Sequence, residues 1–306
     1  MASISTRIGT FSIENPVLLA SGILDETSGS ILRSLREGAG AAVTKSIGVT
    51  ERKGYSTPVI SEIKTGLLNA VGLSNPGIEN FVEEYKNFPE KRKVVVSIFG
   101  GNVEEFSILA RRVEQAGFDK VELNLSCPHV KGVGSEVGQD PELVEEIIAE
   151  IKGHTSLQVW AKLSPNVTDL VALAKAAQKA DAYVLINTLR AIGVEIYSRK
   201  FSLSNVVGGY SGPGIKPVAL RAVYDVYKET QKDIVGVGGI TTWEDAVEFF
   251  LLGARAIEVG TAFIYEDYPI YSKINKGLSD YLDSEGFSRL DDIVGVMVKD
   301  GAFKGH

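Results

Sequence analysis

The segment from Lys120 to Ser164 reads KVELNLSCPHVKGVGSEVGQDPELVEEIIAEIKGHTSLQVWAKLS. Both of its ends are short runs rich in Val, Leu and Ala, which are typical of buried parallel strands. Between them, Asp140 is suited to the N-cap of a helix and the proline after it to the first turn, so we expect a helix over Pro141–Ile151. The segment therefore predicts two parallel strands joined by a crossover helix.

The same unit recurs along the chain of 306 residues. Further helix patterns lie over Val103–Ala116, Asp169–Lys179, Pro217–Glu229 and Thr242–Leu252. They alternate with eight strand-like runs, which are Val17–Ser21, Ala41–Ser46, Val94–Phe99, Lys120–Ser126, Gln158–Ser164, Ala182–Thr188, Asp233–Gly238 and Ala256–Thr261. We predict a single α/β domain over residues 1–306, a (β/α)8 TIM barrel, with an open doubly wound sheet as the alternative.

Three segments fall outside this repeat. The first fifteen residues alternate apolar and polar side chains and predict a small β-hairpin that closes the barrel floor. The connections Ile47–Lys93 and Leu189–Pro213 are too long for plain loops. We expect both as insertions on the C-terminal face of the barrel, where active sites of this fold are built.

The composition excludes several classes of function. With 44% hydrophobic and 23% charged residues the chain is globular, and its net charge of −7 argues against a nucleic-acid-binding surface. The single cysteine allows no internal disulfide and no zinc or iron–sulfur site. The N-terminus lacks an apolar leader, and no apolar run approaches the roughly 20 residues of a membrane span. We therefore expect a cytoplasmic enzyme that binds neither membranes nor nucleic acid.

Polar or glycine residues end six of the predicted strands. A buried core does not favour such residues, and their common position on one face predicts a single active site. The ends are Thr44-Lys45-Ser46, Asn124-Leu125-Ser126-Cys127, Ser164-Pro165-Asn166, Asn187-Thr188, Gly236-Val237-Gly238-Gly239 and Gly260-Thr261.

Two lysines, Lys45 and Lys162, lie in otherwise apolar strands. A buried lysine is unfavourable unless an anion accompanies it, so each either pairs with a neighbouring carboxylate or faces an anionic cofactor or substrate. Their position at strand C-termini favours the second interpretation. The glycine-rich ends of the seventh and eighth strands suit a phosphate group, which indicates FMN in preference to NAD.

Cys127, the only thiol, directly follows the fourth strand. A lone cysteine is commonly a small buried hydrophobe, but at a strand end near cations its pKa can be lowered so that it acts as a base. A Cys–His nucleophile is disfavoured because His129, His154 and His306 are the only histidines.

Together these motifs resemble the class 1 dihydroorotate dehydrogenases over nearly the whole chain. The matching motifs include Ala20-Ser21-Gly22, the run from Asn69 to Gly77, Asn124-Leu125-Ser126-Cys127-Pro128, Lys162-Leu163-Ser164-Pro165-Asn166 and Ser211-Gly212-Pro213. The last of these is similar to the NAD-linked class 1B subgroup. The resemblance implies oxidation of dihydroorotate to orotate with FMN, in pyrimidine biosynthesis. It also implies an electron-transfer subunit with FAD and an iron–sulfur cluster, around a homodimer core or in a heterotetramer.

The resemblance further implies roles for individual residues. Cys127 would remove the C5 proton of the substrate while a hydride passes from C6 to flavin N5, and Lys45 would take part in catalysis. The substrate would contact Lys45, Asn69, Ala70, Val71, Gly72, Leu73, Asn124, Asn187 and Thr188. The FMN site would comprise Ser21, Lys45, Ser46, Ser97, Asn124, Lys162, Ile186, Gly212, Gly238, Gly239, Gly260 and Thr261.

Three positions depart from the family pattern. His129 and Ser97 stand where asparagine is usual, and Val71 where methionine or isoleucine is common. Two other functions stay open: an FMN barrel that reduces another pyrimidine such as uracil, and a non-redox aldolase or isomerase with Lys162 as a Schiff base. Uracil lacks the carboxylate that would pair with Lys45. Without the partner subunit, fumarate or a quinone would replace NAD as the oxidant.

Overall fold

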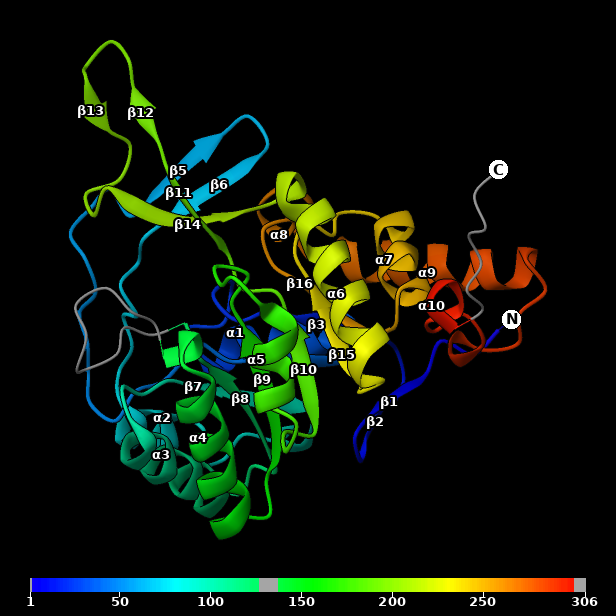
Figure 1. Cartoon of the computed structure of the whole chain (residues 1–306), viewed down its shortest axis with the longest axis horizontal. Helices are drawn as coiled ribbons and strands as arrows, with labels where there is room; N and C mark the ends of the chain where they lie inside the picture. The colour runs from blue at the N-terminus through cyan, green and yellow to red at the C-terminus, as the bar shows by residue number, and fades with distance from the viewer. Residues whose placement is uncertain (1, 127–136, 300–306) are drawn as a thin grey trace.

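The structure, a computed structural model, describes residues 2–126 and 137–299. Its centre is a closed barrel of parallel strands in the order β10-β15-β16-β3-β4-β7-β8-β9 (Figure 1). The pairing of β16 with β3 and of β9 with β10 closes the ring, which excludes the open sheet and confirms the predicted barrel. The strands are β3 (Val17–Leu19), β4 (Ala41–Val43), β7 (Val94–Ile98), β8 (Lys120–Asn124), β9 (Gln158–Leu163), β10 (Ala182–Leu185), β15 (Ile234–Val237) and β16 (Ala254–Val259).

All eight predicted strands are present, but each ends earlier than the prediction. Most of the residues that follow the observed strand ends are polar or glycine, such as Ser46 after β4 and Thr188 after β10. Ser46, Thr188 and Gly260 are examples that line the cavity described below.

Helices cover the outside of the barrel (Figure 1). The five predicted helices, which are α3 to α7, are confirmed with ends shifted by a few residues, whereas α1, α2, α8, α9 and α10 were not predicted. The helices are α1 (Ser28–Arg36), α2 (Ile78–Glu84), α3 (Val103–Gln115), α4 (Pro141–His154), α5 (Leu170–Ala176), α6 (Lys216–Thr230), α7 (Trp243–Leu251), α8 (Phe263–Glu266), α9 (Pro269–Ser284) and α10 (Val296–Lys299). Short 3-10 turns lie at Lys91–Lys93, Val137–Gln139, Pro213–Ile215 and Leu290–Asp292.

Helix α4 shows how local sequence sets these elements. The Asp140 side chain accepts hydrogen bonds from the backbone N–H groups of Glu142 and Leu143, at 3.1 and 3.2 Å, and satisfies two donors that a helix start leaves unpaired. Val144, Ile147, Ile148 and Ile151 are buried on one face of the helix. This spacing of three and four residues places them together against the barrel wall.

A hairpin of β1 (Thr6–Ile8) and β2 (Phe11–Ile13) closes the barrel floor, as predicted. Ile8 and Ile13 pack with Trp160 and other inward-facing residues in the apolar cluster inside the barrel. The lower half of the barrel is therefore filled with apolar side chains.

The two long insertions fold together. β5 (Ile60–Ile63) and β6 (Gly66–Asn69) come from the first insertion, and β11 (Leu189–Ile192) and β14 (Val207–Ser211) come from the second. They form one antiparallel sheet in the order β11-β14-β6-β5. Beyond it, β12 (Val194–Glu195) and β13 (Lys200–Phe201) form a hairpin that extends away from the barrel at the upper left of Figure 1.

Candidate active site

A cavity of about 420 Å³ lies between the C-terminal ends of the barrel strands and the insertion sheet. Its volume is within the range of about 300–1,000 Å³ that is usual for ligand sites. The predicted site residues that line it are Ser21, Lys45, Ser46, Asn69, Ala70, Val71, Gly72, Leu73, Asn124, Lys162, Ile186, Asn187, Thr188, Gly212, Gly238, Gly239, Gly260 and Thr261. The structure therefore brings strand ends and insertion residues to one site.

Ser97 differs from the other described residues that were assigned to the site, because it does not line the cavity. It is fully buried on β7, with its Oγ 2.8 Å from Ser46 Oγ. Its assignment to FMN stays a prediction, with Ser46 between Ser97 and the cavity. Cys127 and His129 lie outside the described residues, so their assignments also stay predictions.

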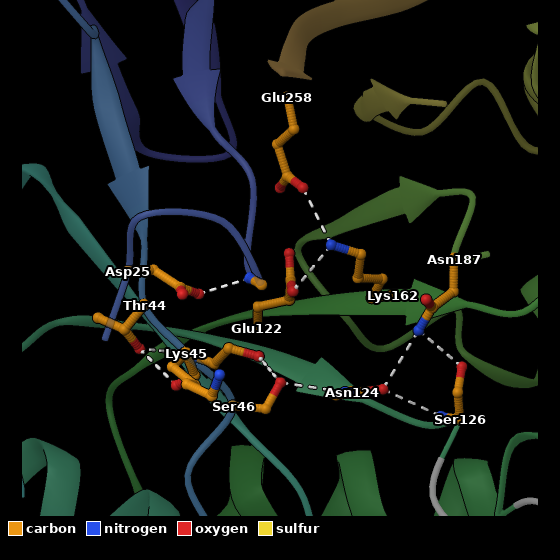
Figure 2. Close-up of polar contacts among 12 residues, drawn as sticks. Asp25, Thr44, Lys45, Ser46, Glu122, Asn124, Ser126, Lys162, Asn187 and Glu258 are labelled. Atoms are coloured by element: carbon orange, nitrogen blue, oxygen red, sulfur yellow. Dashed lines mark hydrogen bonds and ion pairs between the residues drawn. The ribbon is translucent and has the colours of Figure 1, made fainter. Parts of the chain in front are cut away.

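Two asparagine side chains join the ends of β8 and β10 (Figure 2). Asn187 Nδ2 donates a hydrogen bond to Ser126 Oγ at 2.8 Å and lies 3.3 Å from Asn124 Oδ1. Asn124 Nδ2 in turn donates to Ser46 Oγ at 3.0 Å. Since an amide offers both donors and an acceptor, this pre-oriented network can bind the polar edge of a pyrimidine.

Lys45 lines the cavity, with its Nζ 3.1 Å from Glu26 Oε1. The Lys45 side chain is only 17% exposed, whereas that of Glu26 is 75% exposed. An ion pair with such an exposed partner contributes little to stability. Glu26 can therefore turn into solvent, and Lys45 remains available to an anionic ligand in the cavity.

Lys162 lies on the cavity floor between two carboxyl groups (Figure 2). Its Nζ is 3.0 Å from Glu258 Oε2 and 3.3 Å from Glu122 Oε1. Burial alone would lower the pKa of Lys162, but the two carboxylates outweigh it and raise that pKa above its usual value. The ion-pair interpretation is therefore confirmed for Lys162, which also faces the cavity.

Neither Glu122 nor Glu258 was identified from the sequence. Both are buried, and burial together with the nearby Glu258 raises the pKa of Glu122 to about 8, against the opposing effect of Lys162. A signal was present, because each glutamate lies inside an otherwise apolar strand, in the same way as the lysine that was singled out.

A third buried carboxyl, that of Asp25, lies in the loop after β3. Burial raises the pKa of Asp25 to about 6, although the hydrogen bond from the Gly22 backbone and the charge of Lys45 oppose that rise. By accepting the hydrogen bond from the Gly22 backbone, Asp25 fixes the turn that carries Ser21 and Gly22, which both line the cavity.

The first insertion also supplies cavity residues that the sequence did not indicate, among them Arg52 and Tyr55. Arg52 is held by paired backbone hydrogen bonds with Asn75, both 2.9 Å long. Contacts of this kind depend on how the insertion folds over the barrel, and no local pattern in the sequence signals them.

Glycine backbone forms the end of the cavity next to β15 and β16. Gly239 has φ +78°, and a Cβ there would lie 2.8 Å from the Lys216 backbone nitrogen and 3.0 Å from the Gly212 carbonyl oxygen, so only glycine fits. Gly238 and Gly260 continue this bare surface. Loops after the seventh and eighth strands commonly bind phosphate in barrels, so the residues present fit a phosphorylated cofactor.

Within residues 2–126 and 137–299, no helix combines the length and apolar character needed to cross a bilayer. The same ranges contain no cluster of three or more His, Cys, Asp or Glu side chains placed to hold a metal ion.

Comparisons with known proteins agree with this geometry. The family model described as dihydroorotate dehydrogenase matches residues 3–282. The catalytic subunit of dihydroorotate dehydrogenase B (NAD(+)) from Thermoplasma volcanium is 52% identical over 98% of this chain and 100% of its own length. The proteins of the same name from Pyrococcus furiosus (50% identical, 97% of this chain and 99% of theirs) and Methanothermobacter thermautotrophicus (43%, 96% and 98%) are also similar.

Proposed function

Since this chain belongs to the dihydroorotate dehydrogenase family, it is an oxidoreductase that acts on dihydroorotate, and we propose that FMN is the flavin that accepts the hydride. The reaction yields orotate and belongs to pyrimidine biosynthesis. The observation that carries the FMN proposal is the cavity, which joins a bare glycine surface at one end to asparagine side chains and a lysine at the other.

The two ends of the cavity suit the two ligands. Gly238, Gly239 and Gly260 would hold the phosphate of FMN, and Lys162 would face the ring system. Asn124 and Asn187 would bind the pyrimidine edge of the substrate, and Lys45 its carboxylate. The cavity would thus hold FMN and substrate side by side.

The protein groups supply positioning, charge and a base. A bound flavin supplies the hydride acceptor. Lys162 would stabilise negative charge that develops above the cavity floor, and the asparagines would hold the substrate in one orientation. We assign removal of the C5 proton to Cys127, which directly follows Ser126 of the asparagine network.

We expect the purified protein to be yellow and to lose its visible absorbance when dihydroorotate is added without oxygen. Uncharged dihydropyrimidines, such as dihydrouracil, should bleach it far more slowly, because they offer no carboxylate to Lys45. Anaerobic absorbance spectra with a panel of dihydropyrimidines make the measurement. A colourless protein, or equal bleaching by dihydrouracil, would contradict the proposal.

Lys45→Met should raise the KM for dihydroorotate by about 10- to 100-fold, because a hydrogen bond between charged groups is worth about 1.5–3 kcal/mol. Residual activity with an uncharged dihydropyrimidine should change little. Steady-state kinetics of both substrates provide the test, with Lys86→Met, a surface lysine paired to Glu83, as the control. An equal loss with both substrates would remove the carboxylate assignment.

The Schiff-base alternative is disfavoured by the surroundings of Lys162. A Schiff base requires a neutral amine, whereas Glu122 and Glu258 raise the pKa of Lys162 and keep it charged. Among the alternatives from the sequence, the reductase of another pyrimidine is the one that the panel of dihydropyrimidines tests.

The relatives are named catalytic subunits of an NAD-linked enzyme. We infer that this chain too works with an electron-transfer subunit, which would carry FAD and an iron–sulfur cluster. With one cysteine, this chain cannot itself bind a cluster that needs several thiolates. A homodimer core or a heterotetramer is the expected assembly.

A further inference from the structure

The carboxyl pair beneath Lys162 has a charge that Lys162 alone does not balance. Glu122 lies on β8, Glu258 on β16 and Lys162 on β9, so three strands bring them together inside the barrel. The side chains of both glutamates are 0% exposed. If both carboxyls were ionised, the group would carry a net negative charge in the barrel interior.

No other ionisable group of the barrel strands compensates this charge. On the strands that house the pair, Lys120 contacts Asp119, and Arg255 contacts Asp233 and Asp291. Tyr183 on β10 directs its hydroxyl to the Ala174 carbonyl. β3, β4, β7 and β15 carry no titratable side chain.

The hydrogen bonding of the pair also lacks a donor. Within the described residues, both Glu122 oxygens and Glu258 Oε1 are buried and accept no hydrogen bond, although Glu122 Oε1 lies 3.3 Å from the Lys162 ammonium. Only Glu258 Oε2 accepts a hydrogen bond, from Lys162. Two buried carboxylates next to each other repel, and a single proton between them removes both the repulsion and the missing donor.

We propose that Glu122 and Glu258 share one proton, and that this pair, acting through Lys162, takes up a proton when the flavin above it is reduced at alkaline pH. The inference rests on the proposed FMN site. Glu122 and Glu258 are positioning residues here, since they act through Lys162, which would face the ring system of the cofactor. Lys162 and Glu258 both line the cavity, which connects the pair to solvent.

The protons and electrons balance as follows. The hydride brings two electrons and one proton from the substrate C6, and the C5 proton leaves to the base. At alkaline pH the pair has already lost its shared proton. The negative charge that reduction would place near Lys162 then draws one proton from water onto the carboxyl pair. Reoxidation returns that proton to solvent. Below the pKa of Glu122, about 8, the pair already holds its proton and no uptake occurs.

This coupling has a measurable size. One additional proton per two electrons changes the reduction equilibrium tenfold per pH unit, which is about 30 mV for a two-electron couple. Above about pH 8, the midpoint potential of the flavin in the wild-type protein should therefore fall with pH more steeply, by that amount, than in Glu122→Gln. Glutamine has the shape of the protonated carboxyl and cannot titrate.

A second readout needs no flavin. The pKa of Glu122 rises from 4.5 to about 8 on folding, so between these pH values the folded protein binds more protons than the unfolded chain. The contribution of Glu122 to the free energy of unfolding is therefore complete below pH 4.5 and is lost as the pH rises to 8. Because glutamine does not titrate, the free energy of unfolding of Glu122→Gln should rise relative to that of the wild type as the pH increases from 4.5 to 8.

The first measurement is a spectroelectrochemical titration of the flavin-loaded protein from pH 6 to pH 10. The second is urea unfolding of the flavin-free protein between pH 4.5 and pH 8. Glu146→Gln, an exposed site on α4, is the matched control and should follow the wild type in both. Glu258→Gln takes the place of Glu122→Gln if the latter does not fold, with the same expected results.

Parallel unfolding profiles of wild type and Glu122→Gln would show that the pair holds no proton and would overturn the proposal. Equal pH slopes of the midpoint potential would overturn the coupling to the cofactor. A protein that bound no flavin would instead refute the proposed function, and the unfolding profiles would still decide whether the proton is shared.

Discussion

Cys127→Ala is expected to slow anaerobic reduction of the bound flavin by dihydroorotate by about a thousandfold, within the range of about 10²–10⁴ that a general base contributes. The C5 proton is held by carbon and needs an acceptor when the hydride leaves C6. Alanine offers none, whereas FMN would be held by the glycine loops and Lys162, which the substitution does not alter. The variant should therefore stay yellow. Stopped-flow absorbance with saturating dihydroorotate provides the rate.

Two controls separate loss of the base from loss of the site. Dithionite should reduce Cys127→Ala and the wild type equally, because that reaction requires no base. Cys127→Ser should retain more activity than alanine, since a hydroxyl group at this position can still accept a proton whereas a methyl group cannot. Reduction of the alanine variant by dihydroorotate at the wild-type rate would end the assignment of Cys127.

The barrel could be predicted because its signals are local. Each strand is a short apolar run, and helix α4 begins at a capping Asp140 followed by proline, so each element can be identified from its own residues. The C-terminal ends of the strands could be predicted as one site for the same reason. Once a barrel is inferred, its topology places those ends together.

The remaining features depend on contacts between distant segments. The insertion sheet requires Asn69 to pair with Gly209, which no local pattern specifies. The carboxyl pair requires closure of the barrel, because Glu122 and Glu258 lie 136 positions apart in the chain and meet only around Lys162. A buried lysine indicated that an anion was near, but its partners could be identified only from the three-dimensional arrangement.

Lys162→Met is expected to lower the free energy of unfolding at pH 7 by about 3–5 kcal/mol, the usual effect of leaving a buried charge without its partner. Methionine matches the length of lysine but carries no charge, so Glu122 and Glu258 would keep a carboxylate in the barrel interior with no cation. The loss should be smaller at acidic pH, because protonation of a buried carboxylate removes its uncompensated charge. Urea unfolding at pH 5 and pH 7 gives both values.

This loss of stability should come from the unpaired carboxyl charge, and not from altered packing at position 162. Lys162→Met combined with Glu122→Gln and Glu258→Gln should therefore recover most of the stability, because no charge is left buried. Lys179→Met, which breaks an exposed ion pair with Glu145, should change the free energy of unfolding by less than about 1 kcal/mol. If the triple variant were as unstable as Lys162→Met, packing would explain the effect, and the balance of charge among these three residues would not contribute to the stability of the barrel.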